Sequence, residues 1–139
     1  MLNVKTTINN GGKSQVREFA NVIPSRLKTG LYKAGLLVES DAKKKLSGPS
    51  NTKVKGSNPF PGVVTGNLRR SVTTDCQATR VVIGPGGLAE RYAAIQEFGG
   101  MAGRNRLVKI PARPYMSKAL ETVHDKAIDI MFAEFSKAV

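Results

Sequence analysis

The segment YAAIQEFGG, residues 92–100, and the segment IPARPYM, residues 110–116, carry the densest pattern in the sequence. Small apolar residues and aromatics surround a single glutamate, Glu97, which is soon followed by two glycines. The second segment holds Arg113 between Pro111 and Pro114. Such a pattern suits an active site, a buried core or an interface, and the flanking sequence must decide among the three.

The region before these segments begins with an amphipathic helix pattern. Lysines at its end and a Gly48-Pro49 stop favour a helix terminus near residue 46. Pro24 is tolerated in a first turn but suggests a break or kink, so residues 16–22 form either a separate turn or an extension of the helix. The apolar positions with helical spacing are Ile23, Leu27, Leu31, Ala34, Leu37, Val38, Ala42 and Leu46.

Two Val/Ile/Thr-rich runs, residues 68–74 and 79–83, predict an antiparallel hairpin with a turn at residues 75–78. The GPGG at residues 84–87 ends the second strand, and residues 88–98 predict a short helix closed by Gly99-Gly100. Residues 107–110 predict one further strand. A last helix starts after Pro114, with Met116, Leu120, Val123, Ala127, Ile130, Met131 and Phe135 on one face.

The predicted fold class is therefore α+β. A long N-terminal helix and a C-terminal helix pack on a small, mainly antiparallel sheet, and residues 1–139 form a single domain. Residues 47–62 are rich in Ser, Gly, Pro and Asn and predict a long flexible loop. This loop is either an arm that contacts a neighbouring subunit or a flexible surface loop without a role.

Composition indicates a soluble protein made in a cytoplasm. No run approaches the roughly 20 apolar residues of a membrane span, and the first residues lack the apolar run of a signal peptide. The single cysteine, Cys76, excludes an internal disulfide and a cysteine-rich zinc site, and a packing role is expected for it.

Charge is the unusual bulk property. The 22 basic and 10 acidic residues give a net charge of +12, and residues 42–118 hold 14 basic and three acidic groups. Such a field attracts polyanions, although a solvated basic face or an acidic partner subunit explains it equally well. The candidate contacts with DNA or a subunit are Lys43, Lys44, Lys45, Lys53, Lys55, Arg69, Arg70, Arg104, Arg106 and Lys109.

Catalytic patterns are missing from the sequence. His124 lacks a Ser or Cys partner motif, the GPGG segment lacks the spacing of phosphate-binding loops, and no carboxylate pair is placed for acid–base work. We expect no enzyme activity, no catalytic residue, no metal and no cofactor.

Glu97 and Arg113 are predicted to meet. A carboxylate among apolar residues needs a partner, and an arginine held between prolines offers a restrained guanidinium. We favour a structural ion pair over catalysis, with a contact at the rim of another subunit as the alternative.

These segments also resemble a known family. TGNLRRSV at residues 65–72, then YAAIQEFGG, then IPARPYMSKALE are similar in order and spacing to the tail-completion or neck proteins of tailed bacteriophages and to the related phage virion-morphogenesis family. The residues on the family pattern are Gly66, Leu68, Arg69, Ser71, Tyr92, Ala93, Glu97, Gly99, Pro111, Ala112, Arg113 and Pro114. The basic segment 101–109 lies outside this pattern.

The resemblance implies a non-enzymatic virion protein at the head–tail junction, made in the host cytoplasm. It implies a homo-oligomeric ring, a hexamer by preference, between connector or head-closure proteins and tail-tube proteins, with genomic DNA passing through and no membrane contact. Tail completion, head closure and tail terminator stay open as its position within the neck, and twelve subunits stay open beside six. The alternative function is a free basic nucleic-acid-binding protein, although no helix-turn-helix, zinc-finger or aromatic RNA-binding motif is present.

Overall fold

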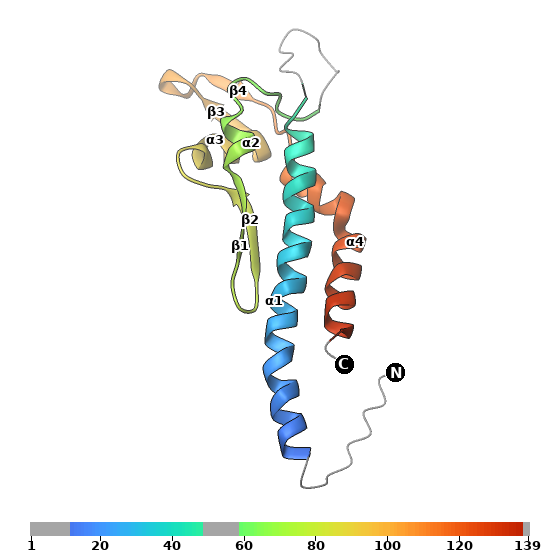
Figure 1. The fold of residues 1–139 in the computed structure, drawn as a ribbon. Coiled ribbons are helices and arrows are strands. Elements are labelled where there is room, and N and C mark those ends of the chain that lie inside the picture. The colour runs from blue at the N-terminus through green and yellow to red at the C-terminus, as the bar shows by residue number, and fades with distance from the viewer. Residues whose placement is uncertain (1–11, 49–58, 138–139) are drawn as a thin grey trace.

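The computed structural model describes residues 12–48 and 59–137, with side chains from residue 21 onward. Figure 1 shows a long first helix, α1 (Gly12–Lys45), with the last helix, α4 (Met116–Ser136), running antiparallel along one side of it and a β-hairpin along another. At about 1.5 Å per residue, the 34 residues of α1 span roughly 50 Å. The predicted α+β class is confirmed.

The remaining elements connect these helices. A short helix α2 (Asn67–Ser71) leads into β1 (Val72–Cys76), which pairs antiparallel with β2 (Val81–Pro85). Helix α3 (Ala89–Phe98) follows, and then β3 (Gly100–Ala102), a 3₁₀ turn η1 (Arg104–Arg106) and β4 (Val108–Ile110), with β3 and β4 also antiparallel. The chain thus has two separate two-stranded sheets among its described residues.

The first helix settles the question left open at Pro24. A single helix runs through Pro24 and starts at Gly12, so the segment 16–22 extends the helix. Pro24 is exposed, and because it has no N–H to donate, one carbonyl of the preceding turn lacks its usual amide partner.

The predicted strand at 68–74 is wrong in its first half. Gly66 has a φ of 74°, which turns the chain into α2, and the Ser71 hydroxyl donates to the Leu68 carbonyl at 2.7 Å. The hairpin itself is confirmed, but it lies two residues later than predicted: its turn is closed by the Gln77 N–H, which donates to the Arg80 carbonyl at 2.9 Å. Gly84 and Pro85 belong to β2, and the turn that follows lies at Gly87 and Leu88.

The helix at 88–98 and the start of the last helix after Pro114 are confirmed. The strand at 107–110 is confirmed as β4, whereas its partner β3 was missed because Gly100–Ala102 is too short to show a strand pattern. The prediction for the loop 47–62 falls mostly on residues 49–58, which lie outside the described residues.

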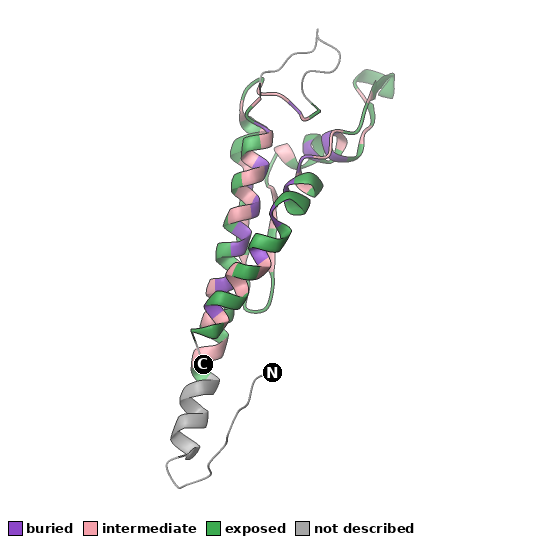
Figure 2. Cartoon of the chain, turned by 90° about the vertical axis from the view of Figure 1, so that its right-hand side faces the viewer, coloured by how far each residue is buried: buried purple, intermediate pink, exposed green. Residues whose placement is uncertain are grey.

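The main core lies where α1, β1 and α4 meet, as the buried residues in Figure 2 show. It is built largely from small side chains: Val38, Ala42, Leu46, Val72, Tyr115, Ala119 and Val123. Gly35 explains how the first hairpin approaches α1, since a Cβ there would lie 2.6 Å from the Thr74 Cγ2 atom and 2.7 Å from the Val81 Cγ2 atom. Two of the predicted core positions are wrong, because Leu27 is 38% exposed and Leu120 is 51% exposed.

Candidate assembly interface

Glu97 caps the last helix from outside that helix. Its carboxylate accepts hydrogen bonds from the backbone N–H groups of Tyr115 at 2.9 Å, Met116 at 3.0 Å and Ser117 at 2.9 Å, and from the Ser117 hydroxyl at 2.5 Å. These N–H groups have no partner within the helix, and the positive end of the helix dipole favours a carboxylate. Tyr115 at the N-cap provides no side-chain cap of its own, so α3 supplies it.

These contacts shift the pKa values of Glu97 and Tyr115. Burial alone would raise the pKa of Glu97, but the hydrogen bonds from Ser117, Met116 and Tyr115 outweigh it and lower the pKa below its usual value. The Tyr115 hydroxyl is affected in the opposite direction: burial and the nearby Glu97 charge raise the pKa of Tyr115 to about 12. Glu97 is therefore a structural carboxylate that stays ionised.

The predicted Glu97–Arg113 ion pair is wrong. Among the described residues, no ion pair joins these side chains, and the contact of Arg113 with α3 is its backbone N–H, which donates to the Gln96 carbonyl at 2.7 Å. The physical reason is that a helix N-terminus compensates a buried carboxylate as well as a guanidinium does.

Gly99 lets the chain turn tightly beside this cap. Its φ of 73° and ψ of 175° belong to a region that is essentially restricted to glycine. A Cβ there would lie 2.8 Å from the Ala112 backbone nitrogen and 3.0 Å from the Ile110 carbonyl oxygen. The segments 92–100 and 110–116 that the sequence singled out are therefore one structural corner.

The other segment of the motif lies at α2. Arg69 donates to the Ser47 hydroxyl at 3.1 Å, and Arg70 donates to the Asn67 side chain at 2.8 Å. Gly66 and Leu68 line a hollow of about 730 Å³ between α2 and the start of α3, together with Tyr92. This hollow is edged by apolar and basic side chains, with no carboxylate among the residues that line it.

The β3–β4 hairpin with its turn, residues 100–110, projects from the body of the molecule (Figure 2), and we call it the basic arm. Large apolar side chains are exposed on it and on α3 beside it. Their exposed fractions are 79% for Phe98, 49% for Met101, 77% for Leu107 and 57% for Val108. Exposed apolar side chains gathered in this way are typical of a surface that another protein covers.

The arm also carries charge on a strained turn. Asn105 and Arg106 have φ values of 58° and 53°, a left-handed conformation that costs a non-glycine residue about 1 kcal/mol or more. The three cations of the arm, Arg104, Arg106 and Lys109, are exposed. Within residues 21–48 and 59–137 none of the three forms an ion pair.

The remaining basic candidates lie near the end of α1 and at α2. Lys43 pairs with Glu39 at 2.5 Å, and Lys45 pairs with Asp41 while its ammonium group lies 5.6 Å from the centre of the Phe60 ring. Lys45 is thus engaged within the subunit. Lys44 is exposed, and it lines a second hollow of about 420 Å³ with Lys43 and Arg69. Lys53 and Lys55 lie outside the described residues.

Comparison with known proteins places this geometry in a family. The model of the phage virion morphogenesis family matches residues 46–134, which is well over half of the chain. The chain belongs to the phage virion morphogenesis family. The matched residues run from the end of α1 through the capped corner to Glu134 near the end of α4, so they include the basic arm.

One curated relative supports this assignment. The chain is 43% identical over 68 residues to the Mu-like prophage FluMu G protein 2 of Haemophilus influenzae (strain ATCC 51907 / DSM 11121 / KW20 / Rd). The aligned region covers 49% of this chain and 47% of the relative, so the chain spans about half the length of the curated relative it matches. No solved structure shows a significant match to the chain.

Family membership gives the coarse function: this is a phage protein with a structural or morphogenetic role, associated with the virion or its assembly. The family suggests a structural, non-enzymatic role. His124 is exposed and contacts only the neighbouring Asp125, at 3.0 Å, and the described residues hold no group of three or more His, Cys, Asp or Glu side chains that could bind a metal. None of the described helices combines the length and the apolar character that a bilayer crossing requires.

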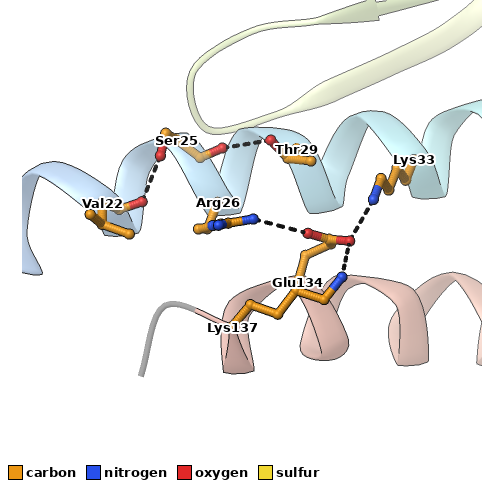
Figure 3. Close-up of polar contacts among 7 residues, drawn as sticks. All are labelled: Val22, Ser25, Arg26, Thr29, Lys33, Glu134 and Lys137. Carbon is orange, nitrogen blue, oxygen red and sulfur yellow. Dashed lines mark hydrogen bonds and ion pairs between the residues drawn. The ribbon is translucent and has the colours of Figure 1, made fainter.

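A second buried carboxylate, Glu134, links the two long helices, and it was not among the residues predicted from the sequence. Glu134 of α4 has a side chain that is 5% exposed, and it accepts hydrogen bonds from Lys33 at 2.5 Å and from Lys137 at 2.8 Å, with the Arg26 guanidinium 3.7 Å away (Figure 3). The available signal was a glutamate seven residues after Ala127, on the apolar face of the helix.

We predict that this cluster makes stability depend on pH. The hydrogen bonds from Lys137 and Lys33 lower the pKa of Glu134 from 4.5 to about 2. Because the pKa is lower in the folded chain, the stabilisation is complete above about pH 4.5 and is lost as the pH falls towards 2. Thermal melts of the wild type from neutral pH to about pH 2 should show this loss. The variant Glu134→Gln should be less stable than the wild type at neutral pH, and its melting temperature should depend less on pH.

Lys33→Met should also weaken this pH dependence, whereas Lys126→Met, at an exposed position of α4, the helix that carries Glu134, should melt as the wild type does at each pH. Identical pH profiles for the wild type and Glu134→Gln would contradict the role given to the cluster.

Proposed function

We propose that this protein is a structural, non-enzymatic component of the bacteriophage head–tail junction, as a neck, tail-completion or tail-terminator protein. It acts as a single junction domain that assembles into a ring around the DNA channel, with six copies as the preferred number. Its partners in this proposal are connector or head-closure proteins on one side and tail-tube proteins on the other.

The observation that carries the proposal is the exposed apolar surface of α3 and the basic arm. Phe98 and Leu107 are more than three-quarters exposed, while the core of the subunit is built largely from alanine and valine. Leaving such side chains in water is unfavourable by about 1.5–3 kcal/mol each relative to burying them. An assembly that covers them accounts for their position, and the morphogenesis family supplies the context in which small subunits assemble.

The positive charge of the chain also suits a ring around the DNA channel. Lys44, Arg69 and the arm cations lie on exposed surfaces at the end of the molecule where α1 terminates. A ring that surrounds genomic DNA places such groups either towards the channel or between subunits, and both locations attract the opposite charge.

A free basic nucleic-acid-binding protein is the second candidate, and the net charge of +12 favours it. The two candidates differ in what the purified chain does alone. Tight duplex binding by a monomer, with affinity falling steeply as salt rises, would support the second candidate and contradict the junction proposal. Weak duplex binding together with concentration-dependent oligomers, measured by sedimentation, is the expected result.

A further inference from the structure

The basic arm is a sheet without neighbours. Its two strands pair only with each other among the described residues, so the outer edge of each strand presents unpaired backbone groups. A two-stranded hairpin is at best marginally stable in water, and this one exposes Met101, Leu107 and Val108. These features indicate that the arm is completed by contact with another surface.

The charge of the arm restricts what that surface can be. Arg104, Arg106 and Lys109 give it three positive charges, and the residues 100–110 include no acidic side chain. The hollow between α2 and α3 is an unsuitable partner because Arg69 and Arg70 line it. Duplex DNA would satisfy the cations but would leave the exposed apolar side chains in water.

The outer face of α4 has the complementary character. Glu121, Asp125 and Asp129 recur at intervals of four residues, so they form one exposed acidic stripe. Glu121 pairs with Lys118 at 2.7 Å, Asp125 contacts the His124 ring at 3.0 Å, and Asp129 forms no ion pair among the described residues. Phe132, 67% exposed, follows Asp125 by seven residues and lies on the same face. This face therefore offers both acidic groups and an apolar contact.

The arm and this stripe lie at different places along the molecule within one subunit. The arm projects from the end of the molecule at which α4 begins, and α4 runs away from it towards the opposite end (Figure 2). A contact between them must consequently join two copies.

We propose that the basic arm of one copy docks on the outer face of α4 of the next copy, with Arg104 and Arg106 against Asp125 and Asp129 and the exposed apolar side chains of the arm near Phe132. This inference rests on the proposed ring. Each copy binds one neighbour through its arm and the other neighbour through the outer face of its α4. The contact therefore joins two different surfaces, and such heterologous contacts can close into rings.

Charge reversal tests the contact. The variant Arg104→Glu/Arg106→Glu and the variant Asp125→Lys/Asp129→Lys should each raise the concentration needed for assembly by roughly tenfold or more, because each places like charges together. Combining all four substitutions in one chain should restore assembly, since the arm is then acidic and the helix face basic. All four sites are exposed, so far-ultraviolet circular dichroism and melting should stay close to those of the wild type.

The matched control is Arg80→Glu, which reverses an exposed cation near the turn of the other hairpin and should assemble as the wild type does. If the arm variant assembles normally, or if the fourfold variant fails to recover, the docking inference is wrong while the ring stands. If the wild type itself stays monomeric, the proposed function fails. Loss of duplex DNA binding in the arm variant, without recovery in the fourfold variant, would assign the arm to nucleic acid and overturn the inference.

Discussion

Replacing Glu97 with alanine is expected to lower the free energy of unfolding by about 2–4 kcal/mol. The substitution removes an acceptor for three backbone N–H groups and one hydroxyl at the start of α4. Tyr115 gives no side-chain cap, so nothing local replaces the carboxylate. Chemical denaturation followed by circular dichroism measures the effect.

Three further variants sharpen this test. Glu90→Ala removes an exposed glutamate from the same helix and should change stability by no more than about 0.5 kcal/mol. Because Glu97 and Arg113 form no ion pair, the effects of Glu97→Ala and Arg113→Ala should add in the double variant. A double variant that is less damaged than the sum would show that the two side chains do interact.

Gly99→Ala is expected to destabilise the chain by about 2–5 kcal/mol. The new Cβ would lie 2.8 Å from the Ala112 backbone nitrogen, and the backbone would have to hold a φ of 73° with a ψ of 175°. Backbone atoms cannot move aside as a flexible side chain can, so the corner between α3 and α4 must shift. Denaturant titration measures the loss.

Gly87→Ala is the matched control for Gly99. Gly87 also has a positive φ, 65°, but a Cβ there would meet no heavy atom within 4 Å. Gly87→Ala should lower the free energy of unfolding only by the cost of holding a non-glycine residue at a positive φ, about 1–2 kcal/mol. Equal losses for the two glycines would contradict the close approach at Gly99.

The helices could be predicted from the sequence because their apolar spacing is long and regular. Val38 and Ala42 in α1, Leu46 just after its end, and Val123 and Ala127 in α4 are buried as their spacing indicated. The first hairpin was placed two residues early, since its bounds depend on the turn at Gly66 and on the Gln77–Arg80 hydrogen bond, neither of which a pattern of side chains reveals.

Charge alone gives the wrong partner for Glu97, at the corner between α3 and α4. The sequence indicated that Glu97 needs a partner, which is right, and it assigned that partner to Arg113, which is wrong. The partners are backbone N–H groups of another helix, and every sequence contains these. One signal was available: the segment before α4 ends in Pro114-Tyr115 and lacks the Ser, Thr, Asp or Asn that usually caps a helix.

The proposed assembly role depends on where charge and apolar surface lie together. The basic segment 101–109 lies outside the family pattern, and its Arg104, Arg106 and Lys109 were only candidate contacts with DNA or a subunit. The structure places this segment on a projecting hairpin with exposed Leu107 and Val108. Neither the positive charge nor the exposed apolar surface of this hairpin would alone indicate a partner. Their combination, opposite an acidic stripe on α4 that also exposes Phe132, favours a second copy of the chain.

Native mass spectrometry of the purified chain over a range of concentrations, with electron microscopy of the same samples, tests the ring most directly. We predict one closed oligomer of fixed subunit number, six by preference, that forms without DNA and appears as an annulus with an open centre. A chain that stays monomeric at every concentration, or that forms only open filaments or DNA-dependent aggregates, would contradict the account.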